Sequence, residues 1–236
     1  MLGSNWLALI ITFALALSWL RFNDFLAHRD LISGPLSRKI IHIGTGPIFV
    51  LCWLLFPDIP YNRYLAALVP FAITIQFALV GLGIIKDQAA VDAMSRSGDR
   101  KEILRGPLFY GIVFVLLTVI YWSDSPIGIV ALMLLCGGDG LADILGRRYK
   151  SRALPWSANK SIIGSIAMFL GGWMFALIIV ALYVAAGKFS QPFSYYFPGI
   201  TLISVVGAIV ESFPLKDFDN LTVPTTAVIL GHLLHF

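Results

Sequence analysis

The apolar residues of this chain are gathered into long runs, without the short alternation expected of elements half buried in a soluble core. A run of about 20 apolar residues crosses a membrane as a helix, with some tolerance for shorter runs. Backbone polar groups in hydrocarbon must be paired within the segment, and the runs lack the alternation of a β-barrel. We therefore predict an all-α fold, a polytopic transmembrane helical bundle of about 7–8 spans. The candidate spans lie near 5–20, 40–56, 64–85, 106–122, 126–137, 162–187, 197–210 and 221–236.

Three of these spans are irregular. The runs at 126–137 and 197–210 are short, and the first of the two is expected to continue as a helix beyond the membrane. The last span, at 221–236, is expected to be partly re-entrant. No Lys or Arg precedes the first run and Arg21 follows it, which indicates a retained first helix with its N-terminus outside rather than a cleaved signal peptide.

The composition excludes a soluble domain. Hydrophobic residues make up 58% of the chain, charged residues only 13%, and the mean hydropathy is +0.84, whereas a soluble domain is about a quarter charged. Cys52 and Cys136 lie inside apolar runs, so they indicate neither a disulfide framework nor a metal site. The sequence shows no linker and no convincing repeat. Residues 1–236 are therefore expected to form a single integral membrane domain.

The basic residues predict the orientation. Of the 17 Lys and Arg residues, 15 lie in four alternate stretches: 21–39, 86–105, 147–160 and 211–220. The intervening connections hold only Arg63 and Lys188. The positive-inside rule then places both termini outside and the basic connections in the cytoplasm. Polar clusters gather on the basic side, and no acidic or basic residue falls clearly at mid-membrane, where an ion-coupled transporter carries them. We expect a site at the membrane surface, between a lipid-like substrate and a charged one.

The strongest polar motif contains Asp139, Asp143 and Arg147 beside several glycines. Residues four apart share one face of a helix, so the two aspartates are expected one turn apart. Two carboxylates at this spacing can hold Mg²⁺, which keeps several waters and is shared with substrate phosphates. Gly138 and Gly140 remove side chains where a nucleotide could approach closely. The alternative is a helix end stabilised by Asp–Arg ion pairs.

A second polar segment follows on the same side. Ser157 or Asn159 is expected to cap the next helix, whose first N–H groups would form an anion site together with Lys160 and Ser161. Ser165 lies one turn further along that helix. The alternative is a capped span whose lysine reaches to the membrane interface. Because the segment follows the aspartate pair, phosphate binding is the favoured interpretation.

Two further motifs lie on the basic side. Arg38 and His42 share a face at the entrance of the second span; Arg38 or Lys39 can hold a phosphate, and His42 can orient or deprotonate a hydroxyl. Taken alone, ordinary topology signals and an interfacial hydrogen-bonded histidine explain them slightly better.

The last basic-side connection unexpectedly carries three carboxylates, those of Glu211, Asp217 and Asp219. Asp219 and Asn220 can provide a second metal contact or a base. An acidic N-cap run before a helix explains them equally well.

Four segments together resemble a known family. They are SRKIIHIGTGP (37–47), CGGDGLADILGRRYK (136–150), LPW with NKSIIGSIAMF (154–156 and 159–169) and ESFPLKDFDNLTVP (211–224). In this order they are similar to the phytol kinase branch of the CTP-dependent polyprenol kinases, which also resembles dolichol kinase and the CTP-dependent diacylglycerol kinase. The resemblance implies transfer of the γ-phosphoryl group of CTP, or of UTP, to the hydroxyl of an isoprenoid alcohol such as phytol. It also implies a plasma or thylakoid membrane of a photosynthetic prokaryote, or a plastid membrane.

The motifs and the resemblance together assign a candidate site. Mg²⁺ is expected on Asp139 and Asp143 together with the nucleoside triphosphate, and the membrane-dissolved prenyl alcohol is expected between helices in the lipid bilayer. No nucleic-acid partner is expected. The predicted catalytic residues are His42, Asp139, Asp143, Lys160 and Asp219. The predicted nucleotide-binding residues are Arg38, Lys39, Gly138, Gly140, Arg147, Asn159, Ser161, Ser165, Glu211 and Asn220.

Three other functions are alternatives to the kinase. A cytidylyltransferase that makes a CDP-lipid would use the same cation and nucleotide but would release pyrophosphate. A lipid or phosphate transporter needs polar residues along a mid-membrane path, which the sequence lacks. A purely structural subunit gives no reason for the aspartates, glycines and the Lys-Ser segment to gather on one side.

Overall fold

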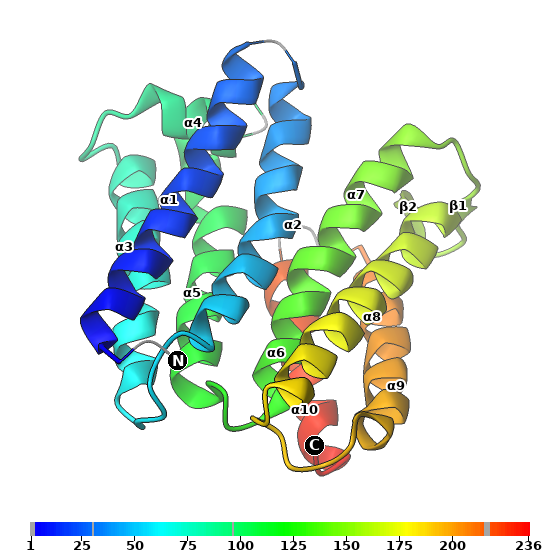
Figure 1. The fold of residues 1–236 in the computed structure, drawn as a ribbon. Helices are drawn as coiled ribbons and strands as arrows, with labels where there is room; N and C mark the ends of the chain where they lie inside the picture. Colours follow the sequence, from blue (N-terminus) through cyan, green and yellow to red (C-terminus); the bar gives the residue numbers. More distant parts are fainter. Residues whose placement is uncertain (1–2, 30, 96, 215–217) are drawn as a thin grey trace.

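The computed structural model describes residues 3–29, 31–95, 97–214 and 218–236. Helices dominate, which confirms the predicted all-α bundle (Figure 1). A 3₁₀ turn, η1, and a single π-helical turn, η2, interrupt the α-helices. In chain order the elements are α1 (Asn5–His28), α2 (Gly34–Trp53), α3 (Asn62–Leu82), α4 (Gln88–Met94), η1 (Arg100–Leu104), α5 (Gly106–Ile120), α6 (Pro126–Met133), η2 (Leu134–Gly138), α7 (Asp139–Arg148), β1 (Ala153–Leu154), β2 (Ser157–Ser161), α8 (Ile162–Ala185), α9 (Phe193–Glu211) and α10 (Asp219–Leu233).

Six helical stretches among the described residues are long and apolar enough to cross a membrane. They are Asn5–Asn23, Asn62–Leu82, Arg100–Ile120, Pro126–Arg148, Ile162–Ala185 and Phe193–Glu211. The other two predicted spans, near 40–56 and 221–236, are the helices α2 and α10, which fall outside this group. The first turns of α2 carry Arg38 and Lys39, which lower its hydropathy, and α10 has only 15 residues. The fifth span does continue as a helix, through η2 into α7, as predicted.

The two ends of the bundle differ in charge. Figure 1 shows both termini at the lower end of the molecule, and the α1–α2 connection, α4 and the β1–β2 hairpin at the upper end. Three of the four basic stretches of the sequence are therefore at one end. At the opposite end, Arg63 pairs with Asp124, and the Nζ of Lys188 lies 3.1 Å from the Oδ1 of Asp58. The fold thus shows the predicted alternation, and the assignment of the basic end to the cytoplasm stays a prediction.

The stretch from α6 through η2 to α7 is the central element of the bundle, with 78% of its span buried. Glycines allow its neighbours to approach. A Cβ on Gly138 would lie 2.7 Å from the Sδ of Met168 on α8, and one on Gly140 would lie 2.2 Å from the Cγ1 of Ile43 on α2. The prediction that these two glycines admit a nucleotide is therefore corrected, because neighbouring helices fill the space beside them. Their close contacts hold α7 against α2 and α8.

Candidate active site

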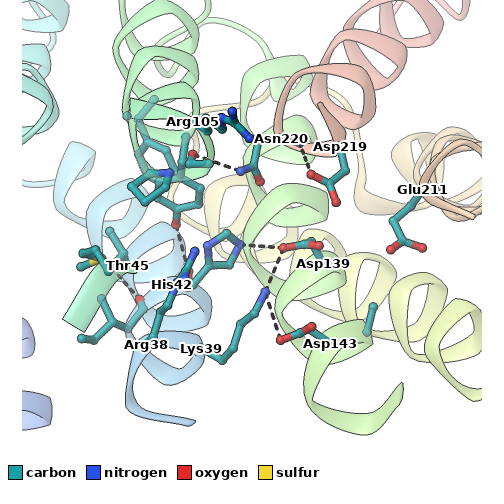
Figure 2. Close-up of a pocket in the computed structure, with 18 of the residues that line it drawn as sticks. Arg38, Lys39, His42, Thr45, Arg105, Asp139, Asp143, Glu211, Asp219 and Asn220 are labelled. Atoms are coloured by element: carbon teal, nitrogen blue, oxygen red, sulfur yellow. Dashed lines mark hydrogen bonds and ion pairs between the residues drawn. The ribbon is translucent and has the colours of Figure 1, made fainter. Parts of the chain in front are cut away.

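A cavity of about 880 Å³ lies at the upper end of the bundle, with a charged part against α7, β2 and the start of α10 and an apolar part between α1, α2, α3 and α5 (Figure 2). Its lining brings together most of the residues that the sequence singled out, from six separate elements. Gly138 and Gly140 are the exceptions. The lining includes Arg38, Lys39, His42, Asp139, Asp143, Arg147, Asn159, Lys160, Ser161, Ser165, Glu211, Asp219 and Asn220.

Three acidic side chains meet in this cavity and form what we call the carboxylate cluster: Asp139, Glu211 and Asp219. One oxygen of each lies within 4.8 Å of the others, and Figure 2 shows the three carboxylates turned toward a common space. Asp139 is the first residue of α7, after the π-helical turn, and Asp219 is the first residue of α10. Helix N-termini stabilise anions, so Asp219 is suited to its position, whereas Asp139 lies within a helical stretch that continues from α6 and η2. Glu211, the last residue of α9, is only 4% exposed.

Two lysines from different elements neutralise this negative charge. Lys160 on β2 binds the carboxylate of Glu211, and its Nζ lies 3.8 Å from the Oδ2 of Asp219. Lys39 on α2 lies 3.4 Å from the Oδ2 of Asp139 and 3.5 Å from the Oδ2 of Asp143. Buried charges are tolerated in proteins when they are paired. The site is therefore a network of paired opposite charges.

The protonation of two residues outside the spanning helices follows from these contacts. Burial opposes the charged form of Lys160, but the carboxylates of Glu211 and Asp219 outweigh this effect and raise the pKa of the lysine. Burial, and next the charge of Asp139, raise the pKa of Asp219 above the usual value of an aspartate. Lys160 thus stays cationic at neutral pH, and Asp219 binds a proton more readily than an exposed carboxylate does.

A lysine bridges the predicted metal pair of Asp139 and Asp143. The two aspartates do share one face of α7, as the spacing of four predicted, but the ammonium of Lys39 contacts both carboxylates. Asp143 also accepts a hydrogen bond of 2.7 Å from the Nε of Arg147 on the next turn. For Asp143 the structure therefore shows the alternative interpretation, an i,i+4 ion pair. Asp139 instead faces Glu211 and Asp219, which are distant in the sequence.

His42 contacts Asp139 rather than open space. Its Nε2 lies 2.9 Å from the carbonyl oxygen of Leu135 and 3.3 Å from the Oδ2 of Asp139. Both neighbours are acceptors, so the Nε2 of a neutral ring carries the proton and donates it. The ring packs against that of Tyr110 at 4.4 Å between centroids, and the Tyr110 hydroxyl donates to the carbonyl of His42. His42 thus orients the carboxylate of Asp139.

The segment before α8 forms a β-hairpin, which the sequence did not predict. Ser157–Ser161 is the strand β2, paired antiparallel with β1. The helix begins only at Ile162, and Ser161 caps it by accepting a hydrogen bond of 3.2 Å from the N–H of Gly164. The predicted capping by Ser157 or Asn159 is therefore wrong, because both residues are in extended backbone. The strand holds Lys160 beside the carboxylate cluster, and the side-chain hydroxyl of Ser157 lies buried without a hydrogen-bond partner among the described residues.

The start of α10 completes the polar end of the cavity. The Nδ2 of Asn220 donates to the carbonyl of Gly106 at 3.1 Å, which ties α10 to α5. Asp219 accepts a hydrogen bond from the N–H of Asn220, the residue after it, and α10 has no side-chain N-cap. The predicted acidic N-cap is therefore not formed by Asp219 or Asn220. Asp217, the third carboxylate of this connection, lies outside the described residues.

Comparison with curated proteins gives relatives along almost the whole chain. The chain is 42% identical to the rice (Oryza sativa subsp. japonica) protein named probable phytol kinase 2, chloroplastic, over 95% of the chain and 74% of that protein. It is 35% identical to phytol kinase 1, chloroplastic, of Arabidopsis thaliana, over 94% of the chain and 72% of the relative. The chain belongs to the phytol kinase family. A farnesol kinase of A. thaliana, also chloroplastic, is 37% identical over 95% of the chain and 73% of its own length.

No protein-family model and no solved structure matches the chain. The relatives confirm the predicted resemblance and the prediction of an enzyme of the kinase class. Membership of the phytol kinase family also agrees with a cavity that is charged at one end and apolar at the other.

The cavity of this phytol kinase family member contains polar residues that the motifs did not single out. Glu102, Arg105 and Tyr110 all line it. In the sequence Arg105 counted only toward the orientation, and Tyr110 stood inside an apolar run. The position of Arg105, directly before a span that begins with Gly106-Pro107, was the one signal in the sequence that could have indicated its place in the site. A basic residue at such a helix start faces the same membrane surface as the other motifs.

Proposed function

We propose that the protein transfers the γ-phosphoryl group of CTP, or of UTP, to the hydroxyl of an isoprenoid alcohol, with phytol as the first candidate. The observation that carries the proposal is the single cavity in which the carboxylate cluster and two lysines open into an apolar space. Such a cavity accommodates a charged nucleotide and the head of a lipid together. The printed names of the relatives, phytol kinase and farnesol kinase, support an alcohol with a prenyl chain.

The carboxylate cluster is suited to hold Mg²⁺. In octahedral coordination at about 2.1 Å, two ligand oxygens lie at most about 4.2 Å apart. The three carboxylate oxygens are within 4.8 Å of one another, so small side-chain movements bring them into range. The cation would neutralise charge on the nucleotide phosphates during transfer. Asp139, Glu211 and Asp219 therefore replace the predicted pair of Asp139 and Asp143 as the proposed ligands.

The basic residues around the cluster would hold the phosphates. Phosphoryl transfer needs mainly positioning and stabilisation of charge. Lys39 and Lys160 already lie against the cluster, and Arg38 lines the same cavity. A bound triphosphate competes with the carboxylates for these lysines. We infer that the lysines move from carboxylate to phosphate when the nucleotide binds.

The hydroxyl of the alcohol needs a group that accepts its proton. The Nε2 of His42 faces Leu135 and Asp139 and donates to them, so only the Nδ1 of this ring is left to accept a proton. Asp219 belongs to the carboxylate cluster and lines the cavity, where a hydroxyl can reach it. A carboxylate has two oxygens, so Asp219 can contact the cation with one and the hydroxyl with the other. We assign the proton transfer to Asp219 and the orientation of Asp139 to His42.

The membrane and its sidedness are part of the proposal. The names of the relatives place those proteins in chloroplasts. We propose a thylakoid, plasma or plastid membrane for this chain, with the basic end and the nucleotide on the cytoplasm-like side.

The experiment uses the purified protein in detergent with Mg²⁺, phytol and CTP labelled at the γ-phosphate. The expected result is label in phytyl phosphate with release of CDP, and parallel reactions with UTP and ATP identify the donor. Label that stays in the aqueous phase, with pyrophosphate released and a CDP-lipid formed from a phosphatidate acceptor, would contradict the kinase and support a cytidylyltransferase.

A further inference from the structure

The cavity continues below the carboxylate cluster as an apolar groove between the helix pairs α1–α2 and α3–α5. The lining follows α2 from Lys39 down to Phe49, which is about 15 Å of helix at 1.5 Å per residue. Phe49 is the last lining residue of α2, and Phe114 is the last of α5. Val69 is the first lining residue of α3, which runs in the opposite direction. These three residues therefore mark the end of the groove farthest from the charges.

That end is closed. Phe49 is 4% exposed, and Val69 and Phe114 are each 2% exposed. The rings of Phe49 and Phe114 pack with their centroids 5.8 Å apart. At the other end the groove meets polar side chains that are partly open to solvent, such as Lys39. The groove thus has an open polar end and a closed apolar end.

The groove also offers little to a polar occupant. Three threonines line it, but each hydroxyl donates to a carbonyl one turn earlier in its own helix. Thr12 donates to Ala8 at 2.8 Å. Thr45 donates to Ile41, and Thr74 to Pro70, both at 2.6 Å. The hydroxyl protons are therefore used within the helices, and the remaining walls are aliphatic and aromatic. Such a groove is complementary to a hydrocarbon chain.

We propose that the groove holds the prenyl chain of the alcohol, and that Phe49, Val69 and Phe114 limit the chain length that the enzyme accepts. This inference rests on the proposed function, because the hydroxyl must reach the carboxylate cluster while the chain lies in the groove. The relatives' names include a phytol kinase and a farnesol kinase, and phytol is one isoprene unit longer than farnesol. A closed end at a fixed distance from the reacting group discriminates between such chains by size.

The test is the substitution Val69→Phe, which fills the closed end. Phosphorylation of phytol and of farnesol is measured with the same preparation, as kcat/KM. We expect the ratio of phytol to farnesol to fall by about tenfold or more, since small changes of fit in an apolar pocket change rates by this amount. The matched control is Val113→Phe, at a buried valine of α5 that does not line the cavity. It should leave the ratio unchanged.

Because the readout is a ratio within one preparation, partial unfolding of a variant does not mimic the expected result. Should Val69→Phe fail to fold, Phe114→Leu tests the opposite change: it lengthens the groove, and kcat/KM should rise for an alcohol one isoprene unit longer than phytol. A ratio that stays unchanged in the folded variant, while both alcohols are phosphorylated, overturns the inference but leaves the proposed function intact. If the unmodified protein phosphorylates neither alcohol, both are overturned.

Discussion

The ion pair of Glu211 with Lys160 shows how strongly the site depends on individual pairs of opposite charges. Its side chain is 4% exposed and is bound by Lys160, which also faces Asp219. A buried carboxylate that loses its partner keeps the cost of desolvation without the compensating attraction. The ion pairs of the proposed cation and phosphate site therefore also contribute to the stability of the fold.

Replacement of Lys160 by methionine should lower the free energy of unfolding by about 3 kcal/mol, because it leaves the carboxylate of Glu211 buried and unpaired. The activity should be lost as well. The double variant Lys160→Met with Glu211→Gln should regain most of the stability but none of the activity. Thermal unfolding in detergent and transfer of label to phytol measure the two effects.

The matched control is Lys188→Met, which removes an ion pair with the exposed Asp58 at the opposite end of the bundle. It should leave the activity unchanged. Recovery of activity in the double variant would contradict the role of Lys160 in binding phosphate.

Among the individual residues, the sequence predicted part of the site. The spacing of Asp139 and Asp143 predicted a shared helix face, which the structure shows. The local pattern contains no information on the partners of each aspartate, because Lys39 and Glu211 reach α7 only through packing of distant helices. The sequence therefore could not show that Glu211 and Asp219 meet Asp139 in the cavity.

Among the elements, α7 determines where Asp139 lies, and its position depends on close packing against α2. A Cβ on Gly140 would lie 2.2 Å from the Cγ1 of Ile43, so α7 cannot accept a side chain there without moving. A Cβ added to Gly146, the next glycine of the same helix, would have its nearest neighbours at 3.4 Å, which is an ordinary contact.

We expect Gly140→Ala to destabilise the protein by about 1–3 kcal/mol through overpacking and to reduce activity, because the helix that carries Asp139 is displaced. Gly146→Ala, the matched control, should be neutral or slightly stabilising, since alanine favours helix more than glycine does. Addition of Ile43→Ala to Gly140→Ala should restore part of the loss. Equal stabilities of the two alanine variants, measured by thermal unfolding, would contradict this explanation.

The hairpin β1–β2 is the element that the sequence least predicted. The serine and asparagine before α8 suggested a cap, but the strand places the cap at Ser161 and keeps Ser157 extended. Cap residues also occur in turns and strand ends, and a two-residue strand such as Ala153–Leu154 has no pattern of its own. The apolar runs, in contrast, located the long helices well.

For the whole molecule, the alternation of basic and non-basic connections predicts which connections between spans lie on the same side of the membrane. Ser97, near η1, and Ser190, between α8 and α9, are both exposed, and the eight-span prediction puts them on opposite sides. Cys52 and Cys136 are buried, so they should react slowly with a polar reagent.

We therefore expect Ser97→Cys and Ser190→Cys to be labelled by a membrane-impermeant thiol reagent from opposite sides of sealed vesicles, with Ser97→Cys on the cytoplasmic side. Labelling of both from one side would contradict the topology. The two positions are separated by α5, by the stretch α6–α7 and by α8, so the result tests whether these three segments cross the bilayer.

We propose that the carboxylate cluster, and not the Asp139–Asp143 pair, carries phosphoryl transfer. The most direct measurement is the rate of label transfer from CTP to phytol as Mg²⁺ is titrated, for Asp139→Asn, Asp143→Asn and the distant control Asp58→Asn. We predict a loss of at least about 100-fold for Asp139→Asn, a loss of less than about tenfold for Asp143→Asn, and no change for Asp58→Asn. Full activity of Asp139→Asn at low Mg²⁺, or an equal loss in Asp143→Asn, would contradict the proposed role of the carboxylate cluster.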